Sequence, residues 1–166
     1  MDNLNLKISH LVKLCNEKSF DKALIEFKSL ITENNKDPII YNLGGVINVS
    51  LRNFENAIDC FSKSLRINPN YAEANNNMGA LLKTIGRTKD SVAYFKKAIN
   101  IKPDFSNAYN NLGASYNVMG KWDLALENYN ECLKINPNEK DSSNNLINLL
   151  TFYNPQKFFQ FHFYDA

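Results

Sequence analysis

The stretch NAYNNLGASYNVMGKWDLALENYNECLKINP, residues 107–137, has the pattern of two helices joined by a turn. Its first half carries an apolar stripe at helical spacing, formed by Ala108, Leu112 and Tyr116. Its second half carries another, formed by Trp122, Ala125, Leu126, Tyr129, Cys132 and Leu133. Gly120 can take the left-handed geometry that ends a helix. Pro137 ends the second stripe, because proline cannot continue a helix interior.

The same pattern returns at intervals of 34 residues. Gly113 corresponds to Gly79 and Gly45, and Pro137 corresponds to Pro103 and Pro69. Tyr129 corresponds to Phe95, Phe61 and Phe27, while Ala125 corresponds to Ser91, Ala57 and Ala23. At the N-terminal end the series weakens, since Asn35 stands at the proline position. Self-similarity at a fixed period of this length indicates a repeat architecture.

A helix-turn-helix period of 34 residues with these residues at fixed places resembles the tetratricopeptide repeat family. We number positions within a repeat so that Gly113 is position 8, Ala125 position 20, Tyr129 position 24 and Pro137 position 32. The resemblance implies an all-α, right-handed solenoid of stacked hairpins, in which each repeat touches its neighbours. Small residues at positions 8 and 20 would let two helices approach closely, and the aromatic residue at position 24 would fill the space between hairpins.

The expected tetratricopeptide repeat domain covers residues 1–153. Its repeats span about 4–37, 38–71, 72–105 and 106–139, and a C-terminal capping helix spans 140–152. The first repeat is atypical, with His10 and Leu11 at positions 7 and 8, as expected of an outer repeat. In the second repeat Gly44 and Gly45 stand at positions 7 and 8. Either Leu43 faces a different way there, or the helix start is adjusted.

The tail over residues 154–166 is rich in phenylalanine and tyrosine, and we interpret it as the degenerate start of a further helix. A helix that is apolar nearly all round needs cover on more than one side. The tail either caps the end of the solenoid, or contacts a further segment or a second copy. Contact with a second copy would make a homo-oligomer through this end. As a strand it would place Phe159, Phe161 and Phe163 on one face.

Composition excludes several classes of function. A net charge of +2 with 22% charged residues gives no nucleic-acid footprint. The cysteines Cys15, Cys60 and Cys132 form no C-x-x-C pair, and a reducing cytoplasm is the expected location. No basic segment followed by an apolar run opens the sequence, so we expect no signal peptide, and no apolar run is long enough to span a membrane.

No enzyme signature stands out. Gly113 to Lys121 superficially looks like a phosphate loop, but its glycines are too far apart and Trp122 replaces the required Ser or Thr. His10 and His162 have no cysteine or carboxylate neighbours at metal-ligand spacing. We therefore expect no catalytic, metal-binding or cofactor-binding residues.

In the family that the chain resembles, the first helices line a concave groove, at positions 2, 5, 6, 9, 12 and 13. Asn-Asn at positions 5 and 6 recurs in three successive first helices, in a helix interior where asparagine is unfavourable by about 0.5–0.7 kcal/mol relative to alanine. The peptide-binding groove is expected to comprise Asn42, Val46, Val49, Asn76, Asn77, Lys83, Asn110, Asn111, Asn117, Asn144, Asn145 and Asn148.

An amide side chain offers both donors and an acceptor, so a column of amides could bind the main chain of an extended peptide. Such a column resembles the asparagine ladder in the repeat arrays of O-linked N-acetylglucosamine transferases. Two other interpretations of these asparagines are tolerated solvent-facing residues and pairs that bridge adjacent helices.

The expected function is a non-catalytic scaffold that binds a protein or an extended peptide. Lys83 is the sole cation at the groove positions, which disfavours the acidic chaperone C-termini that other repeat arrays grip with Lys, Arg and Asn. Ile8, Val12, Val46 and Val49 form an apolar stretch beside Cys15, which suits a partner with a hydrophobic end. The alternatives are the substrate-targeting arm of a larger enzyme, such as a glycosyltransferase, and a self-assembling module.

Overall fold

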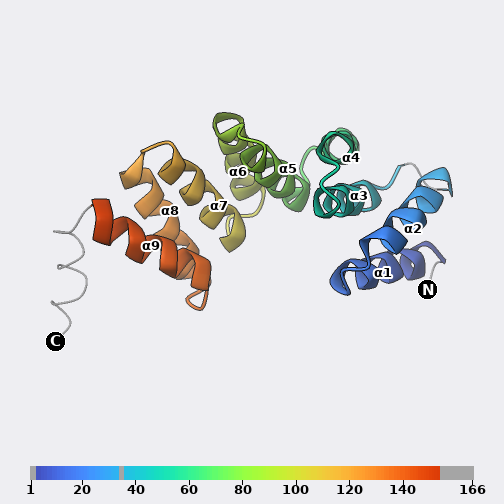
Figure 1. Ribbon diagram of the computed structural model, residues 1–166, viewed down its shortest axis with the longest axis horizontal. Coiled ribbons are helices and arrows are strands. Elements are labelled where there is room, and N and C mark those ends of the chain that lie inside the picture. The colour runs from blue at the N-terminus through green and yellow to red at the C-terminus, as the bar shows by residue number, and fades with distance from the viewer. Residues whose placement is uncertain (1–2, 34–35, 154–166) are drawn as a thin grey trace. The chain divides into compact units, whose positions relative to one another are not determined.

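The computed structural model describes residues 3–33 and 36–153, which form nine α-helices and no strand (Figure 1). The predicted aromatic tail over 154–166 lies outside the described residues. The helices are α1 (Asn3–Asn16), α2 (Phe20–Glu33), α3 (Pro38–Ser50), α4 (Phe54–Ile67), α5 (Ala72–Thr84), α6 (Thr88–Ile101), α7 (Ser106–Val118), α8 (Trp122–Ile135) and α9 (Lys140–Tyr153).

The turns that join the two helices of a hairpin share one backbone feature. Gly86 and Gly120 have φ values of 83° and 69°, in the left-handed region that glycine adopts without steric penalty. Lys18 and Arg52 adopt the same region at the corresponding turns, with φ values of 56° and 59°. The first two hairpins therefore make the same turn with residues that are strained in it.

The chain divides into two compact units, Met1–Leu81 and Leu82–Ala166. In the N-terminal unit α3 packs against α1, α2 and α4. Its core is a cluster of buried side chains: Leu11, Leu14, Ala23, Phe27, Leu30, Ile40, Tyr41, Ile47 and Cys60. In the C-terminal unit α7 packs against α6, α8 and α9, and α8 also packs against α9.

The two adjacent glycines of α3 both have a steric reason. A Cβ added at Gly44 would lie 2.3 Å from the ring of Phe27 on α2, and one at Gly45 would lie 2.3 Å from the ring of Phe61 on α4. Helix α3 begins at Pro38 and Leu43 packs against the core cluster, so the shifted Asn-Leu-Gly string needs no displaced helix start. The double glycine instead lets one aromatic ring approach α3 from each neighbouring helix.

The start of α3 is fixed by a cap. Asp37 has an extended backbone, and its Oδ1 accepts a hydrogen bond of 2.7 Å from the amide of Ile39. Pro38 occupies the first helical position, where its missing N–H would have had no partner. Asp37 and Pro38 together therefore fix where α3 begins.

Candidate functional site

The predicted groove residues of the N-terminal unit lie on α3 and α5. Asn42 and Asn76 are buried, with exposed fractions of 6% and 8%, while Asn77 is half-buried. Asn77 Nδ2 donates to Asn42 Oδ1 at 3.0 Å. The phenol of Tyr71 is also hydrogen-bonded to Asn42, although burial raises the pKa of that phenol overall. Asn42 is thus a junction between two neighbouring segments of the unit.

The apolar stretch predicted beside Cys15 is partly accessible. Ile8, Val46 and Val49 are half-buried, and Val12 on α1 is 37% exposed. Burial raises the pKa of the Cys15 thiol, so this thiol is protonated at neutral pH. The first helices of this unit therefore offer partly accessible aliphatic side chains.

The C-terminal unit carries a second amide pair at the same two repeat positions. Asn145 Nδ2 on α9 donates to Asn110 Oδ1 on α7 at 3.4 Å. The separation along the chain is 35 residues, as it is for Asn77 and Asn42. In both units the amide at position 6 reaches back to the amide at position 5 of the preceding first helix. The structure therefore shows asparagine pairs that bridge adjacent helices, which was one of the interpretations of the column.

Other predicted groove residues of this unit differ in their surroundings. Lys83 Nζ donates to Asn111 Oδ1 at 3.4 Å, and desolvation lowers the pKa of Lys83. Asn117 is hydrogen-bonded to the phenol of Tyr129, whose pKa burial raises to about 12. Asn144 and Asn148 on α9 are exposed. The accessible amides of the column thus gather on α9.

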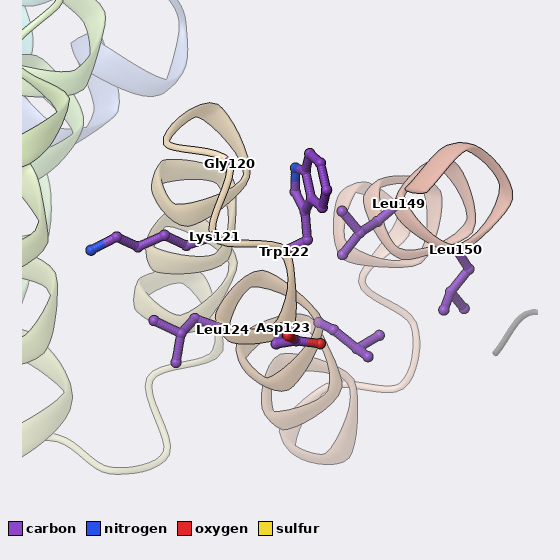
Figure 2. Close-up of a pocket in the computed structure, with 8 residues that line it drawn as sticks. Gly120, Lys121, Trp122, Asp123, Leu124, Leu149 and Leu150 are labelled. Atoms are coloured by element: carbon purple, nitrogen blue, oxygen red, sulfur yellow. The ribbon is translucent and has the colours of Figure 1, made fainter. Parts of the chain in front are cut away.

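A hollow of about 340 Å³ lies near the start of α8 in the C-terminal unit (Figure 2). It is lined by Gly120, Lys121, Trp122, Asp123, Leu124, Leu126, Leu149 and Leu150. In Figure 2 the indole of Trp122 and the side chain of Leu149 lie on the same side of the α8 start, while Lys121 extends the other way. This hollow could not be predicted from the sequence, because two of its four leucines, Leu149 and Leu150, belong to a different helix from Trp122.

Among the described residues, the histidine and carboxylate side chains form no candidate metal centre. His10 Nδ1 lies 2.7 Å from Glu26 Oε2, at a surface position between α1 and α2. Within residues 3–33 and 36–153, no group of three His, Cys, Asp or Glu side chains is placed to hold a metal ion. In the same part of the chain, no helix combines the length and the hydrophobicity that a bilayer crossing requires.

Comparisons with known proteins agree with the repeat period. Models described as the tetratricopeptide repeat match residues 72–105 and 106–139, and a model described as the TPR repeat matches residues 49–86. Together these matches extend over residues 49–139, more than half of the chain. A TPR repeat-containing protein of Methanocaldococcus jannaschii is 44% identical over 50 residues. That match covers 30% of this chain and only 16% of the relative.

Solved structures share the fold. MamA from Desulfovibrio magneticus RS-1 superposes with a TM-score of 0.81 at 21% identity, over 98% of this chain and 92% of that chain. The first TPR of Spaghetti (RPAP3), bound to the HSP90 peptide SRMEEVD, superposes with a TM-score of 0.68 at 18% identity, over 71% of this chain and 94% of that chain. At these identities the likeness concerns the fold alone, and it confirms the all-α solenoid class.

Proposed function

The chain belongs to the tetratricopeptide repeat family, and from this premise we propose that it is a non-catalytic scaffold. Its ligand is a protein segment in an extended conformation, held along the first helices. The similarity to solved structures of this fold supports a protein-interaction role, since one of those structures is bound to a peptide. The free cysteines Cys15, Cys60 and Cys132 fit a reducing compartment, so we place the protein in the cytoplasm. The net charge of +2 gives no reason to include a nucleic-acid partner.

The accessible amides of α9 carry the proposal. Asn144 and Asn148 are exposed on the same helix face, one turn apart, beside the bridged pair of Asn145 and Asn110. The bridge fixes α9 against α7, so the exposed amides are presented by a rigid element. Each amide offers two N–H donors and a carbonyl acceptor, which match the polar groups of an extended main chain. Such a site would read the backbone of its ligand more than its side chains.

The paired amides have a supporting role in this proposal. Each bridging hydrogen bond uses one donor of one amide and one lone pair of the other, so the rest of each amide keeps its capacity. The pairs set the spacing of neighbouring first helices within each unit. Within the C-terminal unit, the half-buried Asn111 and Lys83 would then line the path of the ligand.

The test is a selection of random nine-residue peptides displayed on phage, followed by affinity measurements with the selected peptides. The variant Asn144→Ala/Asn148→Ala should bind about tenfold more weakly, since each lost hydrogen bond is worth about 0.5–1.5 kcal/mol. The control Asn100→Ala changes an exposed asparagine on the second helix α6 and should bind as the parent does. Equal affinity for all three proteins would refute the assignment of the site, and the absence of any selected peptide would refute peptide binding.

A second candidate is the substrate-targeting arm of a larger enzyme, such as a glycosyltransferase. The amide column is the observation that favours it, because it resembles the ladder in such arrays. A longer reading frame with a catalytic domain would separate the two candidates. Self-assembly through the aromatic C-terminal end is a third, and sedimentation at high concentration tests it, since a monomer would exclude it.

A further inference from the structure

A pocket of about 280 Å³ lies in the N-terminal unit among α2, α3 and α4. None of its residues belongs to the predicted groove. It is lined by Leu24, Phe27, Lys28, Ile31, Tyr41, Asn48, Asn53, Asn56, Asp59, Cys60 and Lys63. The second helices α2 and α4 supply most of the lining, so this pocket opens on a different surface from the one the first-helix amides line.

Two side chains that line the pocket are smaller than residues at the same repeat positions elsewhere in the chain. Position 11 is occupied by Leu14, Leu82, Tyr116 and Leu150 in the other first helices, and all four are buried. In α3 the same position is Asn48, whose exposed fraction is 3%. Cys60 on α4 corresponds to Tyr94 in the next repeat. Both substitutions remove volume from the same place.

The floor of the pocket is polar, and the amide nitrogen of Asn48 there already has a hydrogen-bond partner. Asn48 Nδ2 donates to the carbonyl oxygen of Gly44 at 2.8 Å, one turn earlier in α3, and lies 4.0 Å from Cys60 Sγ. Burial raises the pKa of the Cys60 thiol to about 11, so the thiol is neutral at physiological pH. The floor therefore offers an amide and a polarizable sulfur instead of a charge.

The walls favour an aromatic occupant. The rings of Phe27 and Tyr41 meet edge to face, with centroids 6.5 Å apart and an interplanar angle of 77°. Leu24 and Ile31 complete the apolar side. Aromatic rings pair favourably in such edge-to-face arrangements, and sulfur contacts with rings are also favourable. A further ring entering between these walls would find both kinds of contact.

The rim of the pocket is cationic. Lys63 Nζ lies 2.7 Å from Asp59 on its own helix and 5.9 Å from the Tyr41 ring centroid. Lys28 lines the opposite side of the pocket from α2. In the part of the chain that the structure describes, no carboxylate lies within 4.0 Å of the Lys28 ammonium. With two ammonium groups and one carboxylate, the rim is left with a net positive charge.

We propose that this pocket binds an aromatic side chain of a partner protein, next to an acidic residue that pairs with Lys28. The volume of the pocket is just below the range of about 300–1,000 Å³ that holds drug-sized ligands, so it suits one side chain. The ring enters between Leu24, Ile31 and the aromatic walls, above Asn48. The adjacent carboxylate meets the ammonium at the rim. This site is independent of the proposed groove.

The probes are three capped dipeptides, and their binding is measured from chemical-shift changes in ¹⁵N-labelled protein. Acetyl-Phe-Glu-amide should shift the signals of Tyr41, Asn48 and Cys60 with millimolar affinity. Acetyl-Phe-Gln-amide should bind about two- to fivefold more weakly, because an exposed ion pair contributes little. Acetyl-Ala-Glu-amide should leave these signals unchanged. Absence of shifts with the first peptide would overturn the proposal, as would equal binding of the third; equal binding of the first two would overturn its acidic component.

Two variants locate the site. Asn48→Leu restores the residue type found at position 11 of other repeats and fills the pocket, so it should fold and abolish the shifts. Lys28→Gln should erase the preference for Glu over Gln, whereas the matched control Lys22→Gln, an exposed residue of α2 outside the pocket lining, should retain it. Undiminished binding by a folded Asn48→Leu protein would place the ring elsewhere and refute the assignment.

Discussion

The ring of Tyr129 lies where a side chain on Gly113 would begin. A Cβ added to Gly113 would lie 2.7 Å from Tyr129 Cε1 and 3.3 Å from the carbonyl oxygen of Ala125. Both partners are on α8, and Tyr129 and Ala125 are fully buried. The two helices of this hairpin therefore touch through a residue that has no side chain, and position 8 of the repeat is small for that reason.

Gly113→Ala should destabilise the C-terminal unit, although alanine is the better helix former by about 1 kcal/mol. Overpacking a closed core typically costs about 1–3 kcal/mol, and the backbone oxygen of Ala125 cannot move aside as a flexible side chain could. Urea unfolding measures the difference. In the double variant Gly113→Ala/Tyr129→Leu the penalty should shrink, and a single variant more stable than the parent would contradict the steric explanation.

Replacing asparagine by alanine should change the free energy of unfolding in opposite directions at two positions. Asn42→Ala removes a buried amide and leaves Asn77 and the Tyr71 phenol without this partner, so a loss of about 1–3 kcal/mol is expected. Asn144→Ala changes an exposed helical residue and should gain about 0.5–0.7 kcal/mol from helix propensity. Unfolding free energies of both variants check the contrast. A stabilising Asn42→Ala would mean that the bridge contributes nothing.

The N-terminal cap of α3 gives a third prediction. Asp37→Ala removes the acceptor of the Ile39 amide and should cost about 0.5–2 kcal/mol. Asp37→Asn is the matched control, because asparagine caps about as well as aspartate. Hydrogen exchange of the first α3 amides should accelerate in the alanine variant only. Equal exchange in both variants would show that Pro38 alone fixes this helix start.

Stability should fall as the solution becomes alkaline. Burial raises the pKa of Cys60 from 9.0 to about 11 and that of Tyr129 from 10.0 to about 12. Between the unfolded and folded pKa values, the folded chain holds a proton that the unfolded chain has released. The free energy of unfolding then decreases by about 1.4 kcal/mol per pH unit for each such group. The contribution is complete below pH 9 for Cys60 and is lost as pH rises through its folded pKa.

Denaturant unfolding between pH 8 and pH 11 tests this slope. In Cys60→Ala the free energy of unfolding should fall less steeply with pH, because one titrating group has been removed. Tyr129→Phe should have the same effect at higher pH. A slope that is unchanged in Cys60→Ala would show that the thiol does not titrate in this range.

Much of the helical framework could be predicted from periodicity, because residues at positions 8, 20 and 24 have steric roles that the sequence exposes. The apolar stripe from Trp122 to Leu133, ended by Pro137, predicted a helix, and α8 spans Trp122–Ile135. The sequence left open whether the asparagines pair with each other, as Asn77 does with Asn42 and Asn145 does with Asn110. Whether an amide turns to a neighbour or to solvent depends on its rotamer and on the helix spacing, which the period does not specify.

The pocket beside Asn48 lay within reach of sequence reasoning. Comparing position 11 across the repeats shows one asparagine among leucines and a tyrosine. A polar residue at a position that is otherwise large and apolar predicts either a buried hydrogen bond or missing volume, and the structure shows both. The hollow in Figure 2 differs, because it depends on how far Leu149 and Leu150 of α9 stand from Trp122.

Trp122 is the sole tryptophan of the chain, and it stands at the start of α8, with an exposed fraction of 45%. Indole emission will therefore report the melting of the C-terminal unit and remain silent about α1 to α4. In repeat proteins, stability is a sum of local terms, so segments can come apart separately. A fluorescence trace that precedes or follows the circular-dichroism trace would reveal such stepwise unravelling without any added label.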